Sequence, residues 1–188
     1  MTKVYGNLIT KGASGQLGKQ IVFRQSQGDT IMSKFPQFKK SIEESELSKA
    51  NKLRFKSAVM YAKKALNDPE LKQSYKKKCK PHQNAYTRAV EDFLNAPVVE
   101  EIDLSAYTGE PDSYIRVYAT DDFRVNRVLI RIENQQSEVV ETGAAVREGN
   151  TDWWRFTVTG PHPLSGNGKV AVSAFDLPGN EAMSEVAV

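Results

Sequence analysis

Residues 114–133, YIRVYATDDFRVNRVLIRIE, consist of two runs of alternating side chains separated by a short polar stretch. In the first run Ile115, Val117 and Ala119 alternate with polar or aromatic neighbours, and residues 128–132 repeat the pattern. Alternation with a period of two places the two sets of side chains on opposite faces of a β-strand. The stretch therefore predicts two strands, each of which buries one face.

The same alternation continues through residues 98–188, for example at 154–158 and at 170–174. Further strands are expected near three positions, Ile102, Val139 and Val186. About seven strands in roughly ninety residues, separated by turns rich in Gly, Pro, Asn and Asp, are typical of a β-sandwich. The second half of the chain is therefore predicted to be all-β.

Residues 1–40 predict a β-hairpin that follows a glycine-rich start. Residues 21–25 and 30–34 are the two strands, and the turn between them lies around Gly28. The stretch GASGQLGKQ, residues 12–20, has the glycines of a phosphate-binding loop. It lacks the hydroxyl residue after the lysine and leads into a strand, which excludes that motif.

Three helices are predicted between residues 41 and 97. The first follows a capping-box pattern in SIEE, residues 41–44. The second begins at Asp68 and Pro69, a cap followed by a first-turn proline, and the third begins at Pro81. The apolar stripe of the first helix is predicted at six positions, Phe55, Ala58, Val59, Ala62, Ala65 and Leu66.

The two halves of the chain differ sharply in charge. Residues 1–97 contain 19 lysines and arginines against 8 acidic residues, a net charge of +11. Residues 98–188 contain 7 against 15, a net charge of −8. The change near Pro97 predicts two modules, a basic hairpin-plus-helices module at 1–97 and an acidic β-sandwich at 98–188. The predicted fold class is α+β.

Two stretches carry a resemblance to known modules. IRVYATDDFRVNRVLIRIENQQSEVVETGAAV and VAVSAFDLPGNEAMSEVAV resemble bacterial immunoglobulin-like domains of surface and phage-tail proteins. That resemblance implies an immunoglobulin-like sandwich for residues 98–188. The N-terminal half, with its glycine-rich start, VFR strand and basic helices, resembles a family of uncharacterised small bacterial proteins, and this likeness implies no site residues.

A further resemblance concerns the basic helices. LNDPELKQSYKKKCKPHQNAYTRAVEDF, residues 66–93, is similar to the last two helices of a high-mobility-group DNA-binding box. It implies binding of nucleic acid through these helices, although Pro81 lies where the long third helix of that box is continuous.

The residues with reactive side chains do not form a catalytic pattern. The two histidines, His82 and His162, have no metal-ligand spacing. The single cysteine, Cys79, excludes an internal disulfide and is expected to be a half-buried helix residue. We therefore predict that the protein is not an enzyme and has no cofactor.

Acidic residues near the strand ends leave two interpretations. Asp121, Asp122 and Asp176 could supply oxygen ligands for calcium at one end of the sandwich. They could equally be turn residues whose side chains bind nearby backbone N–H groups. The second interpretation is favoured because no calcium-loop pattern completed by a glutamate follows, so no metal site is predicted.

The lysines of the second predicted helix are the leading candidates for a binding site. They are Lys72, Lys76, Lys77, Lys78 and Lys80. Lysines in such a cluster could contact phosphates of a nucleic acid or an acidic protein surface. Trp153 is a second candidate, because the strand register that turns Trp154, Phe156 and Val158 inward leaves Trp153 outside.

These observations predict a non-enzymatic structural or interaction protein. The setting we expect for it is a phage-like or contractile particle, of which it would be a component. The expected partner is another protein or a second copy of the chain, and the alternative is a nucleic-acid-binding protein that uses the lysine-rich helices. The N-terminus has no signal-peptide pattern and no membrane span is expected. The expected location is cytoplasmic, or outside the cell as part of a released particle.

Overall fold

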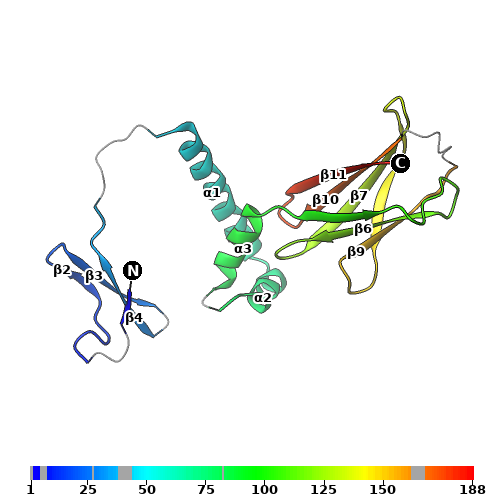
Figure 1. The fold of residues 1–188 in the computed structure, drawn as a ribbon. Helices are drawn as coiled ribbons and strands as arrows, with labels where there is room; N and C mark the ends of the chain where they lie inside the picture. The colour runs from blue at the N-terminus through cyan, green and yellow to red at the C-terminus, as the bar shows by residue number, and fades with distance from the viewer. Residues whose placement is uncertain (1, 5–7, 27, 38–43, 82, 162–167) are drawn as a thin grey trace. The chain divides into compact units, whose positions relative to one another are not determined.

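The computed structural model describes residues 2–4, 8–26, 28–37, 44–81, 83–161 and 168–188. The described residues form three helices, a four-stranded sheet and a seven-stranded sheet, so the chain is mixed α+β (Figure 1). The chain divides into two compact units, Met1–Lys49 and Ala50–Val188. The second unit groups the helices with the large sheet, and the module boundary predicted at 97/98 stays a prediction.

The first unit contains the small sheet, in the order β1-β4-β3-β2. Its strands are β1 (Thr2–Val4), β2 (Gly15–Leu17), β3 (Ile21–Ser26) and β4 (Asp29–Lys34). The predicted hairpin is confirmed, because β3 pairs with β4 from Ile21↔Lys34 to Ser26↔Asp29. Among the residues of this unit whose burial is described, only Thr30 is buried. The described part of the small sheet therefore has no apolar core of its own.

Three helices follow, α1 (Glu46–Ala65), α2 (Pro69–Lys77) and α3 (Ala85–Leu94). Each begins beside a side chain that accepts a backbone N–H. Ser45 Oγ accepts from Ser48, and Asp68 Oδ1 accepts from Glu70 and Leu71. The predicted start of α2 is thereby confirmed.

The starts of the other two helices differ from the predictions. Of the expected capping box, residues 41–43 lie outside the described residues, and α1 begins only at Glu46. Pro81 does not begin α3. That helix begins after Asn84, whose side chain accepts from the Thr87 N–H while the Thr87 hydroxyl accepts from the Asn84 N–H. This reciprocal pair is a capping box that uses threonine where glutamate is usual.

Seven strands form the large sheet, in the order β11-β10-β7-β8-β9-β6-β5. They are β5 (Val98–Asp103), β6 (Tyr114–Thr120), β7 (Val125–Glu133), β8 (Val139–Arg147), β9 (Trp153–Thr157), β10 (Lys169–Asp176) and β11 (Glu181–Ala187). All pairs are antiparallel. The sheet rolls up so that β5, at one end of the order, lies against β11 and β10 at the other. It is therefore nearly barrel-shaped.

The interior of the rolled sheet holds the larger core. The alternating residues of β6, β7 and β10 contribute to it, together with Trp154, Phe156 and Val158. These three side chains are buried, which confirms the predicted register of β9. The apolar faces of all these strands thus meet in one continuous core.

A second core joins the helices to one end of the rolled sheet. Ala58, Ala62 and Ala65 of α1 pack there with residues of α2 and α3. Phe123, from the turn between β6 and β7, belongs to the same cluster. Phe55, which was predicted to lie in the α1 stripe, is exposed instead, because α1 extends past the elements that cover its C-terminal half. Within the described residues, the helices are too short or too polar to cross a membrane.

Candidate functional site

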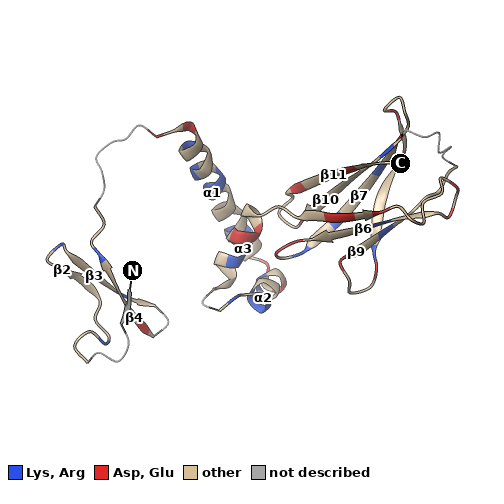
Figure 2. Cartoon of the chain, viewed as in Figure 1, with Lys and Arg blue, Asp and Glu red and all other residues tan. Residues whose placement is uncertain are grey.

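Three of the five predicted lysines are free at the surface of α2. Lys72, Lys76 and Lys77 are exposed, and no described residue pairs with them. Tyr75 between them is fully buried, so α2 turns its single aromatic ring inward and its lysines outward. Figure 2 shows lysine and arginine positions along α1 and α2. These three lysines therefore lie together on the exposed side of α2, and their role in binding stays a prediction.

The other two predicted lysines are also exposed, but each contacts another residue of the protein. Lys78 Nζ donates to the Phe123 carbonyl oxygen and lies 5.0 Å from the centre of the Phe123 ring. Lys80 Nζ lies 2.8 Å from Glu91 Oε1. Hydrogen bonds from Lys80, Gln83 and Arg88 lower the pKa of Glu91 to about 2, against a smaller opposing effect of burial. Lys78 thus connects the end of α2 to the turn after β6, and Lys80 pairs with α3. The spacing of the lysines in the sequence does not reveal these contacts.

Trp153 lies half-buried on the outer face of β9, opposite to Trp154. The Arg116 guanidinium sits 4.5 Å from the centre of its ring, and Tyr118 lies beside it with ring centroids 5.2 Å apart. The outer face of β6 and β9 thus covers part of the indole. Trp153, Tyr118 and Arg116 thus form an aromatic–arginine cluster on this face.

Four aspartates gather where the helices meet the rolled sheet. Asp92 of α3 is fully buried, and Asp121 and Asp122 follow β6 directly. One carboxylate oxygen from each of these three residues lies within 4.8 Å of the others. Asp176, at the end of β10, is also buried and raises the pKa of Asp92 through its charge. Sequence analysis identified three of the four and missed Asp92.

Asp92 is the residue on which this junction centres. The Tyr75 hydroxyl donates to its Oδ2 at 2.6 Å, and the Tyr61 hydroxyl lies 2.8 Å from that of Tyr75. Burial raises the pKa of Asp92 to about 7; the Tyr75 hydrogen bond opposes this shift, and the charges of Asp121, Asp176 and Asp122 add to it. The sequence did carry a signal, since Asp92 lies three residues after Ala89 and beside Phe93, on the apolar face of α3.

The interpretation as turn residues is confirmed for Asp121 and Asp176, in each case through one carboxylate oxygen. Asp121 Oδ2 accepts from the N–H groups of Phe123 and Arg124. Asp176 Oδ1 accepts from those of Gly179 and Asn180. Each carboxylate therefore shapes the turn that follows its strand.

Two long-range contacts fix α3 to these turns. Arg88 is buried; it donates to the Asp122 carbonyl oxygen, and its Nη1 lies 2.8 Å from Glu91 Oε2 and 3.4 Å from Asp122 Oδ2. The Asn180 side chain donates to the Phe93 and Asn95 carbonyl oxygens at the end of the helix. Carbonyls at a helix end lack partners inside the helix, so these bonds also cap α3.

The uncovered side of α1 carries exposed apolar side chains. No residue of the helix before Ala58 is buried. Four large apolar residues are 55–72% exposed, namely Leu47, Leu53, Phe55 and Met60. Leu53 and Met60 are two turns apart and lie on the face opposite to Ala58, Ala62 and Ala65. Of the four, Leu53 and Met60 are the two that share a face of the helix.

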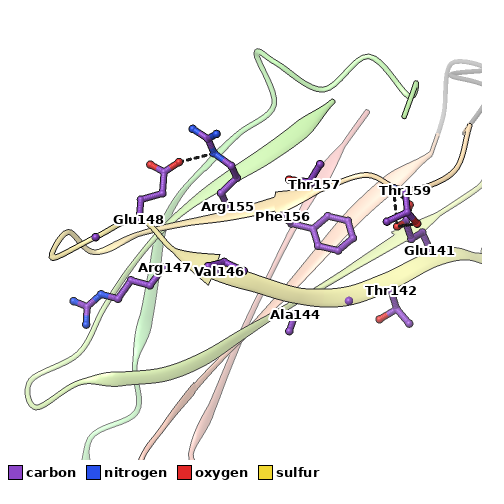
Figure 3. Close-up of a pocket in the computed structure, with 12 residues that line it drawn as sticks. Glu141, Thr142, Ala144, Val146, Arg147, Glu148, Arg155, Phe156, Thr157 and Thr159 are labelled. Carbon is purple, nitrogen blue, oxygen red and sulfur yellow. Dashed lines mark hydrogen bonds and ion pairs between the residues drawn. The ribbon is translucent and has the colours of Figure 1, made fainter. Parts of the chain in front are cut away.

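A groove of about 760 Å³ lies where β8 and β9 separate (Figure 3). The strands pair only at Val146↔Arg155 and Arg147↔Trp154. Beyond these pairs the Phe156 ring points from β9 toward β8 and occupies the place where a side chain at position 143 would lie. The charged side chains that line the groove bind one another or nearby groups, as in the Arg155–Glu148 pair at 2.6 Å. The groove is therefore lined by the separated edges of β8 and β9, and its charged side chains already have partners within the protein.

Comparison with known proteins identifies no relative. A scan against protein-family models gave no match, and searches of curated proteins and of solved structures also gave none.

Proposed function

We propose that the protein is a non-enzymatic structural protein that acts through protein–protein contacts, as a component of a phage-like or contractile particle. The observation that carries this proposal is the exposed apolar surface of α1. Leu53 and Met60 project among lysines from a helix whose other face is packed. A nucleic acid backbone is recognised by charge and does not need such apolar groups, whereas a protein partner buries them.

The partner to which we assign this surface is a second copy of the chain. The segment 1–97 has a net charge of +11 and the segment 98–188 has a net charge of −8. Opposite charges on two segments of one chain favour head-to-tail association, in which the basic helices of one copy meet the acidic strands of the next. The free lysines Lys72, Lys76 and Lys77 would steer this encounter.

We also propose that residues 98–188 are an immunoglobulin-like domain. Numbered from β5, the seven strands follow the order 1-2-5-4-3-6-7 around the rolled sheet. Immunoglobulin sandwiches join strands 1, 2, 5 and 4 in one sheet and strands 3, 6 and 7 in the other. The order of the strands supports the proposal, and β8 is the strand at which the two sheets would connect.

Two variants separate protein association from nucleic-acid binding. Sedimentation velocity of the full chain should show association at low salt that weakens as salt increases. Leu53→Gln with Met60→Gln should abolish it, because the buried apolar contact is lost. Neither the parent nor this variant should bind a labelled DNA duplex tightly at physiological salt.

The second variant replaces Lys72, Lys76 and Lys77 by glutamine, and a control with the same change in charge replaces three exposed lysines outside the helices, Lys11, Lys19 and Lys34. The first triple variant should associate more slowly than the control. A monomeric parent that binds DNA, with log K falling by about 0.9 per phosphate contact as log salt rises, would contradict the proposal and favour the nucleic-acid alternative. Loss of DNA binding in the Lys72, Lys76 and Lys77 variant, with binding retained in the control variant, would also contradict the proposal.

A further inference from the structure

One carboxylate oxygen in the second core has no partner. Asp92 is 0% exposed, and while its Oδ2 accepts from Tyr75, its Oδ1 has no hydrogen-bond donor among the described residues. A buried carboxylate oxygen without a donor is costly, because burial removes water and nothing replaces it. A buried oxygen in this state indicates that the site is completed by something else.

A second oxygen in the same condition belongs to Asp121. Backbone N–H groups hold Asp121 Oδ2 at 2.8 and 2.7 Å, which fixes the carboxylate. Its Oδ1 is buried and also has no donor among the described residues. Asp92, Asp121 and Asp122 bring one oxygen each within 4.8 Å of one another. Asp122 is the most exposed of the three and opens the cluster to solvent.

The neighbouring positive groups contact other atoms than the two unpartnered oxygens. Arg88 contacts Glu91 and Asp122, and Lys78 donates to the Phe123 carbonyl oxygen. Asp176, the other acidic group nearby, has hydrogen bonds to both of its oxygens. Within the described part of the chain, no cation contacts the free oxygens of Asp92 and Asp121.

We propose that Asp92, Asp121 and Asp122 bind a calcium ion that joins α3 to the turn after β6. Calcium takes oxygen ligands at 2.3–2.6 Å, so two oxygens on one ion can lie up to about 5 Å apart. Magnesium ligands at 2.0–2.1 Å can lie only about 4 Å apart and need near-octahedral order. The three oxygens, all within 4.8 Å of one another, are compatible with calcium, whose coordination geometry is also the more flexible. This inference does not depend on the proposed function.

The test is the melting temperature of the full chain after removal of metal with EDTA, measured with added calcium chloride. A ligand that binds only the folded state stabilises it, so calcium should raise the melting temperature in proportion to the logarithm of its concentration. Magnesium at the same concentration should raise it less. Terbium, which replaces calcium, should show luminescence sensitised by excitation of the adjacent Tyr75.

Asp92→Asn and Asp121→Asn should each abolish the calcium response and the terbium signal. Both should still fold, since asparagine keeps the shape and the turn hydrogen bonds and removes a repulsive charge. Asp112→Asn is the matched control, in an exposed position before β6 at its other end, and it should respond like the parent. An unchanged melting temperature of the parent in calcium would overturn the proposal. The two unpartnered oxygens would then be explained by a proton shared between Asp92 and Asp121. Stabilisation of the protein in EDTA by Asp92→Asn alone would support that explanation.

Discussion

Individual residues of β9 show how far alternation in a sequence predicts burial. Phe156 is buried in the larger core, and its ring lies against the backbone of Gly143. Phe156→Ala should lower the free energy of unfolding by about 3–5 kcal/mol, through lost burial and the cavity left behind. Urea denaturation measures this loss. Val146→Ala, at an exposed position, should change it by less than about 0.5 kcal/mol, and a loss below about 1 kcal/mol for Phe156→Ala would contradict the assigned register.

Glu148 gives a prediction for acid pH at the same scale. Burial raises its pKa, but hydrogen bonds from Arg116 and Arg155 outweigh this effect and hold the pKa below its ordinary value of 4.5. The unfolded chain therefore takes up this proton first, so the stabilisation is present above pH 4.5 and is lost as the pH falls below it. Thermal melts from pH 6 to pH 3 should show a smaller acid-induced loss for Glu148→Gln than for the parent. An identical loss would show that the pair contributes nothing.

Among the elements, strands were predictable and helix ends were less so. Strands β6 and β7 have one buried face each, and that alternation is visible in residues 114–133. The start of α3 was misplaced because Pro81 is a common first-turn residue, whereas the side chain that caps the helix belongs to Asn84. Strands β1 and β2 were not predicted, since three residues are too few for a periodic signal.

The capping box of α3 can be tested directly. Asn84→Ala removes the acceptor for the Thr87 N–H, and it should lower the free energy of unfolding by about 1 kcal/mol. Asn84→Ser should restore most of the loss, because serine is also a good cap. Ser57→Ala, on the exposed surface of α1, is the control and should have little effect. Equal stability of Asn84→Ala and the parent in urea would show that the cap is not needed.

At the scale of the whole molecule, sequence composition and structure divide the chain at different places. The charge break near Pro97 is real, yet the helices pack on the turn after β6 through Tyr75 and Phe123, whose rings stack 4.2 Å apart. Contacts between residues far apart in the chain leave no local pattern, so sequence analysis had no means of joining Asp92 to Asp121. The charge composition therefore distinguishes two segments of the chain, whereas the packing joins the helices and the large sheet in one compact unit, Ala50–Val188.

The most direct test of this unit is a denaturation of the full chain followed by two probes at once. The two tryptophans, Trp153 and Trp154, both lie in β9, so their fluorescence reports on the rolled sheet alone. Circular dichroism at 222 nm reports mainly on the three helices. If the second core joins helices and sheet, the two urea transitions should coincide, because cooperative unfolding moves every probe together. Loss of the helical signal at a clearly lower urea concentration than the fluorescence change would contradict the account.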